Sequence, residues 1–279
     1  MTHPQIAAFA RLAKENTAPV RVINGQKTRI SRTMHGLAYD DVHDEIVVPS
    51  PLAQAVLIFR GGAEGEEAPL RVIQGPHTSI VGTGYGALDT VSVDGENNEI
   101  YLPVASDHVL VFDRMASGDV APKRILGGPD TQIRYPVPAD NGPLPPVAID
   151  TVHNLLVVKS TWPRGTTPSF LIFDRTASGN TKPLRVIQGP KAAIGGGNQI
   201  QVYAPKGWII GGATGPGPSV GIWSVNDNGD VPPHWRIPVN KLTGLNVNGV
   251  GIDPMHKEVM VPTGNGNVVM TFFFPEMFE

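Results

Sequence analysis

The phrase Ala-Pro-Val-Arg-Val-Ile-Asn-Gly at Ala18–Gly25 decides the fold, because it recurs along the chain. It returns as APLRVIQG, APKRILGG and KPLRVIQG, and in degraded form as PPHWRIPV, at Ala68–Gly75, Ala121–Gly128, Lys182–Gly189 and from Pro232. The arginines of these phrases lie 50 to 61 residues apart. A repeat of this period is typical of architectures built from stacked supersecondary units.

Each repeat contains three further apolar segments upstream of the arginine phrase. The first ends in an aspartate, at Asp40, Asp94, Asp150 and Asp253. In the first unit the second and third segments are EIVVP (Glu45–Pro49) and AVLIFR (Ala55–Arg60), and the other units contain equivalents. Four short strands in about 50 residues are the content of one propeller blade. The composition agrees, because the chain has 32 Gly and 27 Pro, which favour turns over helices.

We therefore predict one all-β domain, residues 1–279, folded as a β-propeller of four-stranded blades. Five blades are expected, at approximately 36–75, 88–128, 145–189, 198–239 and 247–275. The last unit has three strands, so residues 18–25 are predicted to supply its fourth strand and to close the ring, which would remove exposed edges. Residues 1–17 form an extra segment. Because Ile6–Pro19 aligns with Val109–Pro122, six blades remain the alternative, as does a short helix packed on the ring.

Composition also excludes several classes of protein. The chain has no cysteine, which excludes disulfides, a cysteine nucleophile and thiolate metal sites. Its net charge of −3 gives no electrostatic footprint for nucleic acid. No apolar run has the length of a membrane span, and no signal segment is visible, so the chain as written reads as cytoplasmic. An extracytoplasmic location is the alternative if a native leader is missing.

Across nearly its whole length the repeat resembles NHL-type propellers. A weaker resemblance connects the polar ring described next with gluconolactonase and paraoxonase-type propeller hydrolases, which hold Ca²⁺ in the channel. That resemblance implies a channel metal, although the chain lacks the glutamate that those enzymes place in the ring. The repeat itself specifies architecture rather than chemistry.

Candidate site residues are those that break the repeat near the axis. His35 stands five residues before Asp40, and the same offset gives Asp89, Pro145 and Asn248, with Asn198 the nearest equivalent in the fourth unit. His35, Asp89, Asn198 and Asn248 are a candidate set of ligands for a divalent metal, calcium or zinc. The alternative is a ring of polar strand-entry residues around water. His43, His153 and His256 each follow a repeated aspartate by three residues and are predicted to be structural turn residues.

Lys159 replaces the proline that ends the second strand in three other units, and it could orient a substrate oxygen. The alternative is a solvated loop lysine, because the long side chain readily reaches water. We assign candidate catalytic roles to His35, Asp89 and Lys159. Candidate substrate-binding residues, placed on the loops around the channel mouth, are Tyr85, Trp162, Asp107 and His108. Asp107 and His108 are discounted as a general-base pair, because adjacent side chains on an extended chain point to opposite sides.

Two functions follow from these patterns. The first is a small-molecule hydrolase that opens an ester, lactone or phosphotriester in the channel with a bound metal. The second is a non-catalytic NHL-like module that binds a protein or glycan. The aromatic C-terminus at Phe272–Phe274 must be covered by the N-terminal segment, by the ring or by a second chain, and the last case predicts a homodimer.

Overall fold

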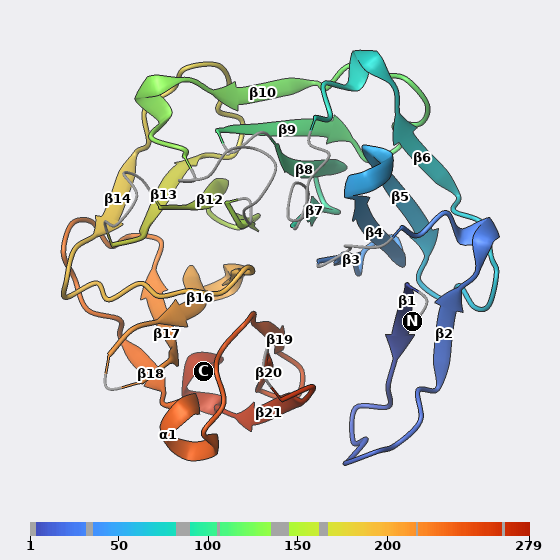
Figure 1. The fold of residues 1–279 in the computed structure, drawn as a ribbon. Helices are drawn as coiled ribbons and strands as arrows, with labels where there is room; N and C mark the ends of the chain where they lie inside the picture. Colours follow the sequence, from blue (N-terminus) through green and yellow to red (C-terminus); the bar gives the residue numbers. More distant parts are fainter. Residues whose placement is uncertain are drawn as a thin grey trace.

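The chain folds as a five-bladed β-propeller, as the repeat predicts (Figure 1). The structure is a computed structural model, and it describes residues 4–31, 36–81, 90–104, 107–134, 145–161, 167–215, 217–263 and 266–279. Within each blade, neighbouring strands are antiparallel and follow chain order. The first strand of each blade faces the central axis in Figure 1.

The first four blades are complete four-stranded sheets. Blade 1 contains β3 (Ala38–Asp40), β4 (Glu45–Ser50), β5 (Ala55–Arg60) and β6 (Arg71–Gln74). Blade 2 contains β7 (Ser92–Asp94), β8 (Glu99–Val104), β9 (His108–Asp113) and β10 (Arg124–Gly127). Blade 3 contains β11 (Val147–Asp150), β12 (Leu155–Ser160), β13 (Ser169–Asp174) and β14 (Arg185–Gln188). Blade 4 contains β15 (Gln201–Tyr203), β16 (Trp208–Ala213), β17 (Ser219–Ser224) and β18 (Trp235–Ile237).

Blade 5 differs from the other four because its sheet has three strands. They are β19 (Gly251–Asp253), β20 (Glu258–Pro262) and β21 (Val269–Phe273). The described helical structure consists of the short α1 (Val239–Thr243), which precedes blade 5, and several single 3₁₀ turns. The fold is therefore almost entirely β, in agreement with the high Gly and Pro content.

The predicted closing strand forms, but with a different partner. Residues Arg21–Asn24 are β2, and they pair with β1 (Gln5–Ala8) in a separate two-stranded sheet, not with β21. The predicted pairing of residues 18–25 with blade 5 is therefore wrong. The alternative of a short helix in the N-terminal segment is also wrong, because Gln5–Ala8 forms a strand. The physical reason lies in the sequence: β1 has the pattern of a third strand, and only residues 9–20 separate it from β2. A local hairpin therefore competes successfully with a partner at the other end of the chain.

Each blade is attached to the next by a repeated backbone contact. The fourth strand of one blade forms a parallel bridge with a glycine in the outer turn of the following blade, as in Ile73 with Gly118 and Leu126 with Gly179. β2 makes the same contact with blade 1, where the Asn24 N–H donates to the Gly65 carbonyl at 3.0 Å. The hairpin β1–β2 therefore occupies, relative to blade 1, the place of the outer half of a preceding blade.

The repeated aspartates are structural, as predicted from their spacing. In blade 3, an Asp150 carboxylate oxygen accepts the His153 backbone N–H at 2.8 Å, and the other oxygen bonds the His153 ring at 2.8 Å. The same pattern joins Asp40 to His43 and Asp253 to His256. The three histidines are therefore confirmed as members of turns between first and second strands.

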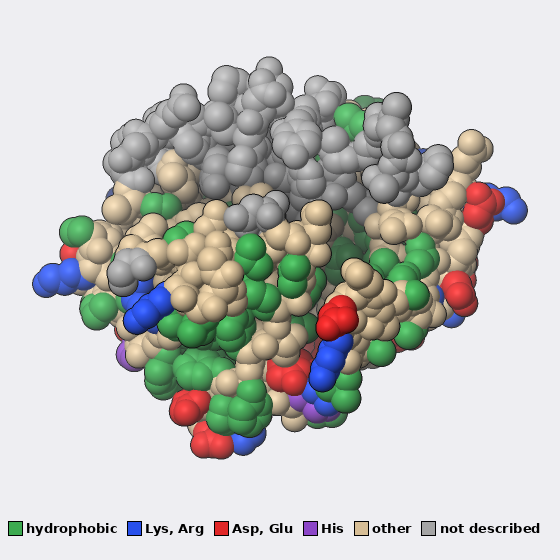
Figure 2. All heavy atoms as spheres, turned by 60° about the horizontal axis from the view of Figure 1, so that its bottom comes forward, with side chains coloured by type: hydrophobic (Ala, Val, Ile, Leu, Met, Phe, Trp, Pro, Cys, Tyr) green, Lys and Arg blue, Asp and Glu red, His purple; other side chains and the backbone are tan. Residues whose placement is uncertain are grey.

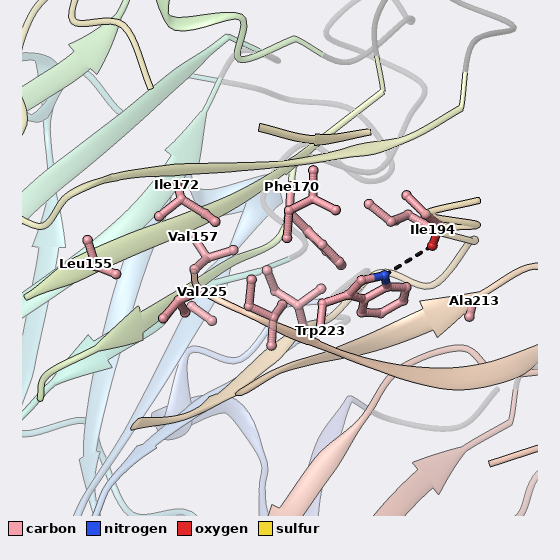
Figure 3. Close-up of a cluster of buried hydrophobic side chains, with 13 residues drawn as sticks. Leu155, Val157, Phe170, Ile172, Ile194, Ala213, Trp223 and Val225 are labelled. Carbon is pink, nitrogen blue, oxygen red and sulfur yellow. Dashed lines mark hydrogen bonds between the residues drawn. The ribbon is translucent and has the colours of Figure 1, made fainter. Parts of the chain in front are cut away.

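Aliphatic side chains pack between the blade faces and form the core. Between blades 3 and 4 the largest buried side chain is Trp223, whose indole N–H donates to the Ala192 carbonyl at 3.1 Å (Figure 3). Its ring packs edge-on against Phe170 with centroids 5.1 Å apart. The C-terminal Phe272 and Phe274 are partly buried against blade 5 and its neighbours, whereas Phe273 is exposed. The ring itself thus covers part of the aromatic C-terminus.

Two carboxylates connect three consecutive blades. Glu45 on β4 accepts hydrogen bonds from Arg71 of its own blade at 2.6 Å and from Arg114 of blade 2 at 2.9 Å. Glu99 on β8 binds Arg124 of its own blade and Arg175 of blade 3, each at 2.7 Å. We call each of these arrangements, a second-strand Glu with one Arg from its own blade and one from the next, a carboxylate clamp.

Burial alone would raise the pKa of the Glu99 carboxyl, but hydrogen bonds from Arg124, Tyr101 and Lys123 outweigh it and hold the pKa at about 2. The pKa of the neighbouring Tyr101 phenol shifts the other way, because burial and the Glu99 carboxylate both raise it. Glu99 is therefore ionised at any ordinary pH, and both clamps join buried opposite charges.

Candidate functional site

The central channel contains a cavity with a volume of about 660 Å³. Its wall consists mainly of aliphatic side chains from the first strands, among them Val93, Ala148, Ile200, Val202, Val250 and Ile252. Thr90, Ser92, Gln199 and Gln201 add hydroxyl and amide groups. Pockets of several hundred Å³ with an apolar wall and a few polar groups are typical of small-molecule sites. The sequence analysis placed its candidate residues around this axis, and that placement stays a prediction.

The channel is wider on one side than on the others. Around the other blades its wall is formed by first strands and the residues beside them, but at blade 5 it also includes Met260 and Pro262 of β20 and Val269 of β21. Neighbouring first strands are in contact from β3 through β7, β11 and β15 to β19, whereas β19 and β3 do not form such a contact pair. Figure 2 shows this side of the molecule, with hydrophobic side chains inside the hollow. The cavity therefore reaches past the first strand of blade 5 to its second and third strands.

Lys159 lies at the boundary between blades 3 and 4, and its side chain is not a solvated loop lysine. It is 1% exposed, and its ammonium group donates to the Gly197 carbonyl at 2.9 Å. Burial lowers the pKa of the amine to about 8. Alternation along β12 places this side chain inside the protein at the strand's end, so the alternative interpretation from sequence is wrong. The repeat correctly singled out the position, but it gave no information about burial.

Asp107 and His108 are brought together, contrary to the argument from alternation. The His108 ring bonds the Asp107 carboxylate directly, and both side chains are partly exposed. Asp107 belongs to a turn that precedes β9, so the alternation expected of an extended strand does not apply to it. The pair lies at the start of β9, on the side of blade 2 where second and third strands are connected. Neither residue lines the channel cavity, and a substrate-binding role for the pair stays a prediction.

The predicted metal set is only partly described. Asn198 and Asn248 are neighbours across blades 4 and 5, because the Asn198 N–H donates to the Asn248 carbonyl at 2.8 Å. His35, Asp89, Tyr85 and Trp162 lie outside the described residues. Among the residues that are described, no group of three or more His, Asp or Glu side chains could hold a metal ion. The two asparagines alone therefore do not make a fitting site for calcium or zinc.

A second hollow of about 240 Å³ lies beside blade 4 and was not predicted from the sequence. Its lining includes Gly196, Gly212, Gly215 and Gly217, so much of its wall is backbone. The Arg236 guanidinium closes one side by bonding the Thr214 carbonyl. The signal that could have revealed it is the density of glycine between residues 195 and 221.

Within the described part of the chain, no helix is long and apolar enough to cross a membrane.

Comparisons with known proteins confirm the architecture. No protein-family model and no curated protein sequence matches the chain. A chain in the crystal structure of a nidogen/laminin complex superposes with a TM-score of 0.63 at 12% identity, over 99% of this chain and 87% of that one. A chain of the mitotic checkpoint complex gives a TM-score of 0.55 at 12% identity, over 92% and 67%. At these identities the likeness shows the propeller fold alone.

Proposed function

We propose that the protein binds a small, mainly apolar molecule in its central channel. The observation that carries this proposal is the channel itself, about 660 Å³ in volume and walled by aliphatic first-strand side chains. Burying apolar ligand surface there supplies the affinity, at roughly 25 cal/mol per Å². Gln199, Gln201, Thr90 and Ser92 then orient a ligand that carries one or two polar atoms.

Hydrolysis of an ester, lactone or phosphotriester bound in the same channel is the second candidate. Lys159 favours it, since an amine with a pKa of about 8 is partly neutral near neutral pH and can then accept a proton. Because the amine is buried, a role in the reaction requires that substrate binding uncover it. The gluconolactonase-like resemblance supports hydrolysis, whereas the NHL-like resemblance favours a non-catalytic module that binds a protein or glycan.

Binding is tested with the neutral apolar dye Nile red. Saturable fluorescence enhancement is expected with the wild-type protein. Ser92→Phe, which fills the channel from β7, should weaken binding about tenfold or more, whereas the matched Ser117→Phe on the exposed outer turn of blade 2 should not change it. Equal dye affinity in the two variants, with unchanged melting temperatures, would place the dye outside the channel and overturn the proposal.

The hydrolase candidate is tested on the same variants. p-Nitrophenyl butyrate, an aliphatic lactone and a phosphotriester serve as substrates, with and without chelator. Turnover that Ser92→Phe abolishes and Ser117→Phe retains supports chemistry in the channel. Among turnover-competent preparations, full activity in the double variant His35→Ala, Asp89→Ala would remove those two residues from the catalytic assignment.

A further inference from the structure

The outer edge of β21 is the unusual edge in this ring. In blades 1 to 4 the third strand is covered by a fourth, whereas β21 is hydrogen-bonded to β20 on one side only. Its exposed face is apolar, with Val269 66% and Phe273 70% exposed. The equivalent third-strand residue of blade 1, Val56, is fully buried. Such an edge is a template for pairing with another strand.

The complete blades define which residues a strand on this edge would meet. Arg124 of β10 lies opposite Val111, and Leu126 lies opposite Val109. The registers of blades 2 and 5 can be aligned, because Glu99 lies opposite Asp113 and Glu258 lies opposite Phe273. By this alignment Thr271 corresponds to Val111, and Val269 corresponds to Val109. An added strand of the repeat type would therefore place its arginine opposite Thr271. Its apolar residue two positions later would cover Val269.

Glu258 forms an incomplete carboxylate clamp, in which only one of the two arginine positions is filled. It begins β20 as Glu45 and Glu99 begin β4 and β8. One oxygen accepts a hydrogen bond from Arg11 of the N-terminal hairpin at 2.7 Å. Arg11 is the counterpart of Arg114 and Arg175, the arginines that the following blade contributes. Among the described residues, no arginine from a fourth strand reaches Glu258, since its sheet has none.

The N-terminal hairpin lies beside blade 5, since Arg11 contacts Glu258, and we call the space between β21, Glu258 and Glu15 the slot. In the complete blades, the N–H of a turn glycine donates to the fourth strand of the preceding blade, as Gly118 does to the Val72 carbonyl at 2.7 Å. Glu15 is the corresponding hairpin residue, and it holds the same left-handed conformation, with φ +52° against +77° for Gly118. Its backbone is thus already shaped for a strand lying between the hairpin and β21.

The chain's own candidate strands are engaged elsewhere. β2 has the matching sequence, but it is paired with β1 and bridged to Gly65 of blade 1. The fourth strands β6, β10, β14 and β18 are each paired within their own blades. Among the described strands, none is free to pair with β21 while these pairings stay intact, so we consider a strand supplied by another protein.

We propose that the slot between β21, Glu258 and Glu15 binds an extended segment of a partner protein by strand addition. The segment carries the pattern Pro-x-Arg followed by two large aliphatic residues. The arginine completes the clamp on Glu258 while Arg11 remains in place, as two arginines share Glu45 and Glu99. Backbone pairing with β21 gives affinity, and burial of Val269 adds to it. The site shares Val269 with the channel wall, but Glu258 and Glu15 do not line the channel.

The test uses a labelled peptide with the sequence of residues 181–191, TKPLRVIQGPK, which copies the fourth strand of blade 3. Saturable binding is expected by fluorescence anisotropy with the full chain. Replacing the peptide's arginine with alanine should weaken binding about tenfold, and so should Glu258→Gln in the protein. Glu279→Gln, which removes a nearby exposed carboxylate paired with Lys257, is the matched control and should not change affinity.

Backbone pairing is tested separately from the ion pair. Two further peptides, N-methylated at alternate residues, present opposite sets of N–H groups, and strand addition predicts that one of them binds and the other does not. No saturable binding, or equal binding to Glu258→Gln and wild type with unchanged urea midpoints, would overturn the proposal. So would a wild-type dimer that Glu258→Gln dissociates, because the slot would then belong to a second copy of the chain.

Discussion

Two interfaces contain the same glutamate–arginine arrangement, one complete and one incomplete. They are the interface between blades 2 and 3 and the interface between blade 5 and the N-terminal hairpin. In the first, Glu99 is 5% exposed and binds arginines from both sides. In the second, Glu258 is 16% exposed and binds Arg11 alone among the described residues. The difference in burial leads us to expect unequal contributions to stability, because surrounding protein excludes the water that screens an ion pair.

The largest effect is expected where the clamp is complete. Glu99→Ala leaves Arg124 and Arg175 buried without their carboxylate, and should lower the free energy of unfolding by about 3–5 kcal/mol. Urea unfolding measures this loss, with Glu96→Ala in the exposed turn of the same blade as control. A loss below about 1 kcal/mol would show that the blade interface does not depend on the clamp.

An intermediate effect is expected between blades 3 and 4, where a charge is buried without a clamp. In the unfolded chain Lys159 keeps its proton up to its ordinary pKa of 10.5, but in the folded chain only up to about 8. The unfolded state therefore binds more protons between these values, and stability rises with pH through this window. Lys159→Met should remove that rise and should stabilise the protein at pH 7 by roughly 3 kcal/mol.

The measurement is the difference in unfolding free energy between Lys159→Met and wild type at a series of pH values. Using the difference cancels the titration of other groups. A difference that stays constant from pH 7 to pH 10.5 would mean that the lysine is not desolvated in the folded protein.

The smallest effect is expected at the incomplete clamp. Glu258→Gln should lower stability by about 1 kcal/mol or less, because Arg11 is substantially exposed and the pair is screened. The loss should shrink further in concentrated salt. A loss as large as that of Glu99→Ala would show that the hairpin is held to blade 5 as firmly as complete blades are held to one another.

Much of the fold could be predicted because the repeat is local and regular. Ala18–Gly25 and its copies specified the strands, the Asp150–His153 type of turn and the single propeller domain. The site could be predicted less well. The position of Lys159 was recognised as exceptional, but its burial depends on which neighbouring blade packs over it, and a single repeat unit carries no information about that.

The sequence by itself determined the blade register, because alternating apolar residues and turn residues act over short distances. Only the tertiary structure decided the partner of β2, since β1 and β21 are both compatible third strands and the choice depends on chain connectivity. The same applies to the contact of Asp107 with His108, which depends on a turn, and to the apolar wall of the channel, which depends on how the first strands face the axis. The channel wall forms where distant segments meet, and the other two features depend on turn and loop geometry that the repeat pattern does not specify.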